Sequence, residues 1–309
     1  MGRTSERLPG IVTSILDILR VTERAGSAGE QSPVVVLANG FCTSTASWDA
    51  VAATLPATWR VIRFEYVGTA GTPAEAWIPG RHTTLEGHAA DVVSMLRTLA
   101  VKDVVFVGHS MSAMIGALVW QAAPELIGRL VMLGASPRYI DDVGYWGGFT
   151  ELQIDALVEA ASIDLERWIA GFAPVALGEQ ATRAHLDHFI GNLLEMRPDI
   201  ARDMVRLVFQ VDMRALIPTI ACPVELLQSH FDAAVPPIVG VRLQKRFPNA
   251  TLDVLPVNGH VPQMTHRAVV ADRLNAILAR ASRGDDPSDD YRGNGGLGVP
   301  TRASTSLGT

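Results

Sequence analysis

The residues best placed to do chemistry are a serine, an aspartate and a histidine, each following an apolar run. Ser110 stands in the sequence GHSMS at 108–112, between the apolar run 103–107 and the small-residue segment 113–122. Small residues around such a serine let a strand and a helix crowd together, which exposes the serine Oγ at the turn between them. The pattern predicts a nucleophile elbow, with a strand before Ser110 and a helix after it.

An elbow serine needs a base, and the order serine, acid, histidine indicates where the partners lie. Asp232 comes shortly after an apolar run at 224–228, and His260 lies in a glycine-containing loop after the next such run. An aspartate or histidine in these settings is also a common turn residue. Taken together, the three predict Ser110 as nucleophile, His260 as general base and then acid, and Asp232 as the group that orients the imidazole.

Acyl transfer also needs two backbone N–H donors that face the developing oxyanion. Met111 follows the nucleophile and supplies the first donor. Phe41, in the loop 39–42 after the apolar run 34–38, is expected to supply the second. Cys42 then lies near the site, either as a reactive thiol or as a small filler, and we favour the filler.

Other histidines have simpler interpretations. His230 lies close to Asp232, and we expect it to be a loop residue rather than the base. His109 is expected to pack inside the elbow. His185 and His188 are spaced as i and i+3 on a helix, which could suit a metal, but no cysteine or carboxylate set accompanies them. A solvated helix face is therefore predicted for that pair, and no metal or cofactor is expected.

Composition narrows the class of protein. The 309 residues are 48% hydrophobic and 19% charged, with a net charge of −6, so nucleic acid is an unexpected partner. No apolar run reaches the roughly 18 residues of a membrane span. Two cysteines form no disulfide framework, which favours a reducing cytoplasm. Lys102 and Lys245 are the only lysines, which suggests GC-rich coding and a bacterial source.

Apolar runs alternate with helical patterns over much of the chain, which predicts an α/β fold with a mainly parallel sheet and helices on both faces. Expected strands are 34–38, 60–65, 103–107, 130–133, 224–228 and 251–255, and expected helices include 85–99 and 269–281. Between the expected strands 130–133 and 224–228 the alternation stops, and four helices are expected near 151–161, 163–173, 179–196 and 199–209. The predicted parts are an N-terminal extension with the first strand region (1–30), a core (31–135 and 217–282), a helical cap (136–216) and a disordered tail (283–309).

From about 34 to 278 the chain resembles the RsbQ-like α/β-hydrolases, which include the bacterial stress-signalling hydrolase RsbQ and the plant karrikin and strigolactone receptors. The matching stretches are NGF (39–41), VIRFEYVG (61–68), VGHS (107–110), GASPRY (134–139), GGF (147–149), MRPDIA (196–201) and GHVPQM (259–264). The resemblance implies an α/β-hydrolase fold with a four-helix cap inserted after the sixth strand, and the same triad of Ser110, Asp232 and His260.

The resemblance also implies a V-shaped cap over an apolar pocket. By similarity, its lining falls on Phe41, Tyr139, Leu157, Phe172, Phe189 and Phe209, although each of these could equally be part of helix packing. Two positions depart from the family: Asn39 replaces a usual histidine or proline, and Cys42 a usual glycine. The oxyanion loop is therefore expected to differ from that of the family.

Three functions follow as hypotheses. The leading one is a serine hydrolase that cleaves a small apolar ester or a butenolide lactone, such as a strigolactone- or karrikin-like ligand, through an acyl-enzyme. The alternative is a slow-turnover ligand sensor with a signalling protein partner, as in RsbQ. A third is a biosynthetic enzyme that uses the same pocket for acyl transfer or cyclisation.

Overall fold

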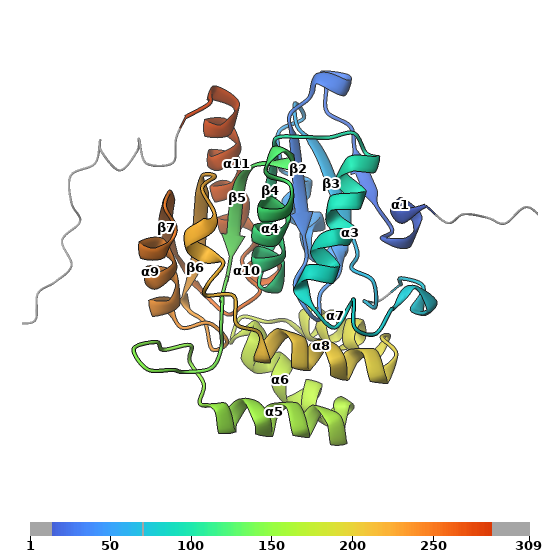
Figure 1. Ribbon diagram of the computed structural model, residues 1–309, viewed down its shortest axis with the longest axis vertical. Coiled ribbons are helices and arrows are strands. Elements are labelled where there is room, and N and C mark those ends of the chain that lie inside the picture. The colour runs from blue at the N-terminus through green and yellow to red at the C-terminus, as the bar shows by residue number, and fades with distance from the viewer. Residues whose placement is uncertain (1–13, 70, 286–309) are drawn as a thin grey trace, which may run out of the picture.

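A twisted sheet of seven strands forms the centre of the molecule (Figure 1). The computed structural model describes residues 14–69 and 71–285. The strands, in chain order, are β1 (Thr22–Arg24), β2 (Val34–Ala38), β3 (Arg60–Phe64), β4 (Val104–His109), β5 (Ile127–Leu133), β6 (Val224–Phe231) and β7 (Ala250–Asn258). Their order in the sheet is β1-β3-β2-β4-β5-β6-β7, with β1 antiparallel to β3 and every other pair parallel. The prediction of a mainly parallel sheet is confirmed.

Helices cover both faces of this sheet, as the alternating pattern predicted. The helices outside the cap are α1 (Ile15–Ile18), α2 (Asp49–Ala52), α3 (Leu85–Thr98), α4 (Met111–Ala122), α9 (Pro237–Arg246), α10 (Pro262–Thr265) and α11 (Arg267–Arg283). Strand β4 is buried along its whole length. Its Val104 and Phe106 join the core under α3, α4 and α9, whereas Val105 and Val107 join the core under α2 and α11. Side chains of a strand alternate between faces, so this central strand serves two cores.

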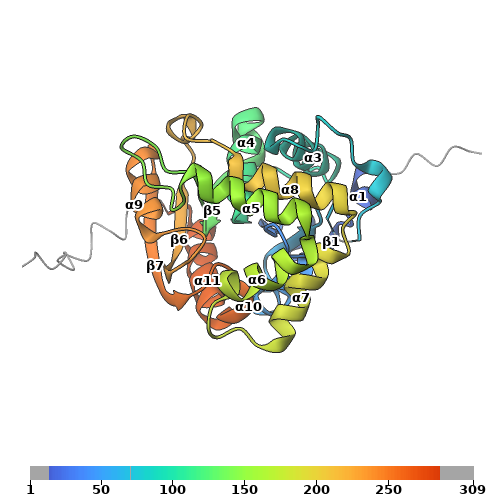
Figure 2. The ribbon, with the colours of Figure 1, turned by 90° about the horizontal axis from the view of Figure 1, so that it is seen from below.

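Four helices between β5 and β6 form a cap over the carboxyl ends of the parallel strands (Figure 1). They are α5 (Glu151–Ile163), α6 (Leu165–Leu177), α7 (Arg183–Leu194) and α8 (Pro198–Gln210). Seen from below, α5 lies beside α8 and α6 beside α7 (Figure 2). Thr150, Asp164 and Thr182 cap the first three of these helices by accepting backbone N–H groups. The cap follows the fifth strand of the described residues, whereas the resemblance implied that it follows the sixth.

Several boundaries differ from those expected. The short strand β1 lies in the predicted first strand region (1–30), but its bounds were not predicted, because Thr-Glu-Arg carries no apolar alternation and pairs only at the sheet edge. Arg283 is the last residue of α11, so this helix enters the segment that was expected to be disordered. Residues 286–309 of that segment, and 1–13 at the other end, lie outside the described part. Within the described residues, no helix is long and apolar enough to span a membrane.

Candidate active site

Ser110 occupies a sharp turn between β4 and α4, where the sequence predicted an elbow. Its backbone has φ 56° and ψ −120°, a conformation that L-residues rarely adopt. Gly108 makes the turn possible, because a Cβ on it would lie 2.5 Å from the carbonyl oxygen of Ser112. The Ser110 N–H donates to the carbonyl oxygen of Leu133 at 2.9 Å, which fixes the turn against β5.

His260 links the serine to the aspartate. Its Nε2 lies 2.8 Å from the Ser110 Oγ, and its Nδ1 lies 2.8 Å from the Asp232 Oδ2. The second carboxylate oxygen of Asp232 accepts N–H groups from Ala234 at 2.8 Å and Val235 at 3.0 Å. Two backbone donors stabilise the ionised carboxylate and hold it toward the imidazole. The Asp232 side chain is fully buried, so this ion-dipole arrangement is shielded from water.

The loop that carries His260 is anchored on both sides. On the core side, the Ser229 hydroxyl of β6 donates to the carbonyl oxygen of Gly259 at 2.7 Å. On the cap side, the His260 N–H donates to the carbonyl oxygen of Ala176 in α6 at 2.7 Å. Gly259 has a φ of +96°, and a Cβ on it would lie 2.4 Å from the carbonyl oxygen of Leu177. Only glycine lets the cap approach this closely.

The two expected oxyanion donors belong to two segments that meet at Ser110, since a Cβ on Gly40, next to Phe41, would lie 3.1 Å from the Ser110 Cβ. Met111 is the first residue of α4, and its N–H therefore has no intrahelical acceptor. Phe41 lies in the loop after β2 and is 7% exposed. Among the described residues, neither N–H group donates to another protein atom. Both are free to bind a ligand oxygen.

The loop that contains Phe41 is held by a buried network around Glu65, which the sequence analysis did not identify. Glu65 Oε1 accepts the N–H of Thr45 at 2.7 Å, and Oε2 accepts the side-chain amide of Asn39 at 3.3 Å. The same amide donates to the carbonyl oxygen of Thr43 at 2.8 Å. Burial raises the pKa of Glu65 to about 7, against the opposing effects of these donors and of Arg20.

Cys42 lies in this loop with a φ of 62° and is 3% exposed. Burial raises the pKa of its thiol well above the ordinary value, so the thiolate form is disfavoured. A buried, protonated thiol acts as a small apolar residue. The geometry therefore agrees with the filler role rather than with a reactive thiol.

The six residues expected to line a pocket belong to one large apolar cluster or pack against it, and four of them are in ring contact. Tyr139 and Phe209 have ring centroids 5.2 Å apart, and Phe172 lies 5.9 Å from Phe209 and 6.3 Å from Phe189. Phe41 is buried beside the elbow, and Leu157 is half-buried. Trp168, which the sequence analysis did not select, stacks on Phe172 at 4.9 Å.

Tyr139 connects this aromatic cluster to the triad. Burial raises the pKa of its hydroxyl to about 12, against the opposing effect of the Ser110 side chain. The aromatic cluster thus reaches the surroundings of Ser110.

The remaining histidines occupy different settings. His109 packs against His260 at a ring separation of 5.1 Å and donates from Nε2 to its carbonyl oxygen at 2.8 Å. Burial lowers the pKa of His109 to about 3, which keeps it neutral. His230 is an exposed residue of β6, not of a loop, because that strand extends three residues beyond the predicted end.

The pair on α7 is half-buried rather than on a solvated face. His185 Nδ1 accepts the N–H of Thr182 at the start of the helix, and His188 Nε2 lies 3.4 Å from the hydroxyl of Ser44 in the core. Burial lowers the pKa of His188. The described residues contain no group of three or more histidine, cysteine or acidic side chains that could hold a metal.

Comparisons with known proteins agree with this fold. A family model described as the alpha/beta hydrolase fold matches residues 33–267. The chain belongs to the alpha/beta hydrolase family. Among solved structures, a hydrolase from Oleispira antarctica superposes with a TM-score of 0.82 and 25% identity, over 86% of this chain and 96% of its own.

Two curated relatives place the chain within a narrower group of that family. A rice protein (Oryza sativa subsp. japonica), named as a probable esterase, is 38% identical over 77% of this chain and 88% of its own length. The strigolactone esterase of Arabidopsis thaliana is 32% identical over 86% of this chain and 98% of its own length. Both relatives are plant proteins, so they give no support to the expected bacterial source.

Proposed function

We propose that this protein is a serine hydrolase that cleaves a small apolar ester or a butenolide lactone, such as a strigolactone- or karrikin-like ligand. The observation that carries the proposal is the continuous hydrogen-bonded chain from Ser110 through His260 to Asp232, next to the aromatic cluster. No cofactor takes part. The name of the Arabidopsis relative, a strigolactone esterase, supports the same substrate class.

In the first half of the reaction, His260 Nε2 takes the proton of the Ser110 hydroxyl as Oγ attacks the carbonyl carbon of the ester. The carbonyl oxygen becomes an oxyanion, which accepts the N–H groups of Phe41 and Met111. Asp232 holds the imidazole and stabilises the imidazolium. Collapse of the intermediate breaks the ester bond, and the leaving oxygen takes the proton from His260.

In the second half, a water molecule attacks the acyl-enzyme. His260 again takes a proton, and its return to Ser110 Oγ releases the carboxylic acid and restores the enzyme. Each half moves one proton through the same imidazole nitrogen. The 2.8 Å separation between Nε2 and Oγ suits this transfer.

The substrate class follows from the surroundings of the serine. Tyr139, Phe172 and Phe209 offer ring surfaces rather than charged groups, so a peptide or a sugar would lose hydrogen bonds to water without replacement. A small ester with an apolar body would bury that body against the rings.

Two histidine variants test the hydrolase role. His260→Ala is expected to lower kcat/KM for p-nitrophenyl acetate and for a synthetic butenolide by about 10³-fold or more. His230→Ala removes an exposed histidine near the same acid loop and is expected to retain wild-type rates. Equal rates in the two variants would rule out His260 as the base.

A second candidate function is a slow ligand sensor that signals to a protein partner. The hydrogen bond from His260 to Ala176 favours it, because a ligand that alters the catalytic loop would also act on cap helix α6. The sensor would show a ligand-dependent rise in melting temperature, and a partner protein that co-purifies only with the ligand. Fast multiple turnover without such a partner would favour the hydrolase alone. For either function, a cytoplasmic location remains our proposal from the cysteine usage.

A further inference from the structure

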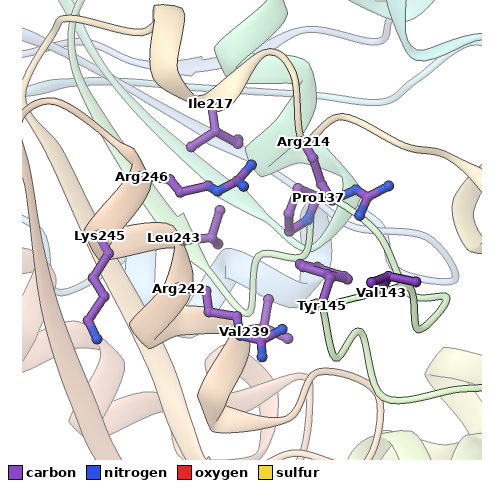
Figure 3. Close-up of a pocket in the computed structure, with 11 residues that line it drawn as sticks. Pro137, Val143, Tyr145, Arg214, Ile217, Val239, Arg242, Leu243, Lys245 and Arg246 are labelled. Carbon is purple, nitrogen blue, oxygen red and sulfur yellow. The ribbon is translucent and has the colours of Figure 1, made fainter.

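A pocket of about 270 Å³ lies where the cap joins the core, and none of the three triad residues lines it (Figure 3). It is bordered by residues 137–145 of the segment after β5, by residues 214–217 after α8, and by residues 239–246 of helix α9. The first two segments connect the core to the cap, one before α5 and one after α8. The pocket therefore touches both connections of the cap and a helix of the core.

Four of its lining residues are cationic and none is acidic, although the chain as a whole carries a charge of −6. We call it the basic pocket, after Arg214, Arg242, Lys245 and Arg246. Arg214 is already balanced, because its Nη2 lies 2.7 Å from a carboxylate oxygen of Asp212 and 2.8 Å from one of Asp142.

The other three cations have no such carboxylate partner among the described residues. Arg242, Lys245 and Arg246 are spaced as i, i+3 and i+4 on α9, which places like charges on one helix face. In the part of the chain that the structure describes, none of the three forms an ion pair. The Nη1 of Arg242 is buried and has no hydrogen-bond partner there. An anion in the pocket would relieve this repulsion and satisfy that nitrogen.

Tyr145 holds two of the guanidinium groups in place. The Cζ of Arg214 lies 5.0 Å from the centre of its ring, and the Cζ of Arg242 lies 5.4 Å from it. Figure 3 shows Arg242 directed toward Tyr145, and Arg246 directed toward Pro137 and Arg214, whereas Lys245 points away from them. Arginines that are positioned before a ligand arrives lose less side-chain entropy on binding.

Apolar side chains complete the lining. Ile217, Val239 and Leu243 are buried, whereas Val143 is exposed and the ring of Tyr145 is half-buried. Inorganic phosphate would leave the surfaces of Val143 and Tyr145 in contact with water. A ligand with an apolar body would cover these two side chains while its charged group meets the guanidinium groups.

We propose that the basic pocket binds a small organic anion, namely a carboxylate or phosphomonoester attached to an aromatic or aliphatic body. The anionic group lies between the guanidinium groups of Arg242 and Arg246, and the body covers Val143 and the ring of Tyr145. This site is separate from the proposed hydrolytic site and does not depend on Ser110.

Isothermal titration calorimetry of the full chain at low salt, with phenyl phosphate, benzoate and inorganic phosphate, tests the proposal. We expect phenyl phosphate to bind with a Kd below about 1 mM, and at least about tenfold more tightly than inorganic phosphate. The double variant R242Q/R246Q should lose at least about tenfold in affinity for phenyl phosphate, and R242K/R246K should lose less because it keeps both charges.

The matched control is R183Q/R267Q, which removes the same two charges from exposed positions away from the pocket. It should bind phenyl phosphate as the wild type does. Wild-type affinity in R242Q/R246Q, an equal loss in the control, or no binding of any probe would each overturn the proposal. Arg246 is exposed, so the single variant Arg246→Gln provides the same comparison if the double variant does not fold.

Discussion

The backbone N–H of His260 donates a hydrogen bond to the carbonyl oxygen of Ala176, at 2.7 Å, so a cap helix holds the loop that carries His260. Ala176 lies in the last turn of α6, where carbonyl oxygens have no intrahelical partner. One such carbonyl oxygen thus accepts the backbone N–H of the residue that carries the imidazole. The position of the imidazole relative to Ser110 depends on the cap being in place.

Gly259→Ala tests this dependence. The added Cβ would lie 2.4 Å from the carbonyl oxygen of Leu177, at a residue with a φ of +96°. The loop must shift, and a displacement of about 1 Å in a catalytic group can cost about 10²-fold in rate. We expect kcat/KM to fall by a factor on the order of 10 to 100, measured with p-nitrophenyl acetate.

The matched control is Gly171→Ala, in the same cap helix. A Cβ at Gly171 meets no atom within 4 Å, so alanine there should keep the wild-type rate and modestly raise the melting temperature. Wild-type turnover in folded Gly259→Ala would show that the cap contact does not position His260.

Asp232→Asn tests the role of the acid. Asparagine keeps the size of the side chain, but its amide cannot hold the imidazole in the tautomer that the reaction needs. By analogy with serine hydrolases in general, we expect kcat to fall by about 10⁴-fold with a nearly unchanged melting temperature. Asp253→Asn, which breaks only the surface ion pair with Arg273, serves as the control and should keep full activity. A small effect of Asp232→Asn would mean that another group orients His260.

The raised pKa of Glu65 makes stability depend on pH in a specific direction. Its folded-state pKa of about 7 lies above the ordinary value of 4.5, so the folded protein binds this proton more tightly than the unfolded chain. The stabilisation is complete below pH 4.5 and is lost as the pH rises toward 7. The loss amounts to something on the order of 3 kcal/mol.

Chemical denaturation at pH 5 and pH 8 measures this effect. Glu65→Gln cannot ionise, so its free energy of unfolding should decrease less than that of the wild type between the two pH values. Glu159→Gln alters an exposed carboxylate of α5 and should follow the wild type. If Glu65→Gln also followed the wild type, Glu65 would not be the buried group that titrates.

The two thiols are expected to be unreactive in the folded protein. Burial raises the pKa of Cys42 well above the ordinary value and that of Cys222 to about 12, and only the thiolate attacks a disulfide reagent. At pH 8, Ellman's reagent should therefore label neither cysteine within minutes, and should label both after unfolding in guanidinium chloride. Rapid labelling of Cys42 with loss of activity would instead make it a reactive thiol.

Much of the fold could be predicted because its signals are local. Strand β2 coincides with the predicted range 34–38, and each predicted strand corresponds to an observed one. The bounds of strand β1 within the predicted first strand region could not be given, because its three residues have no apolar pattern and pair only with β3. Helix α7 begins four residues later than expected, at Arg183, because Thr182 caps it.

The candidate site was predicted to the extent that it depends on the order of residues along the chain. The structure brings Ser110, Asp232 and His260 together, although 150 residues separate the first from the last. The link between Glu65 and the loop at Asn39 could not be predicted, because nothing in the sequence indicates which buried amide meets that carboxylate. The same applies to the contact of His188 with Ser44, which depends on where the cap rests on the core.

The most direct test of the central claim is intact-protein mass spectrometry during turnover of p-nitrophenyl acetate and a synthetic butenolide. The wild-type protein should gain the mass of the acyl group while substrate is present, and should return to its original mass after the substrate is consumed. Ser110→Ala should stay folded, gain no mass and release no product. Turnover by Ser110→Ala, or an adduct on another residue that is competent for turnover, would contradict the assignment of Ser110 as the nucleophile.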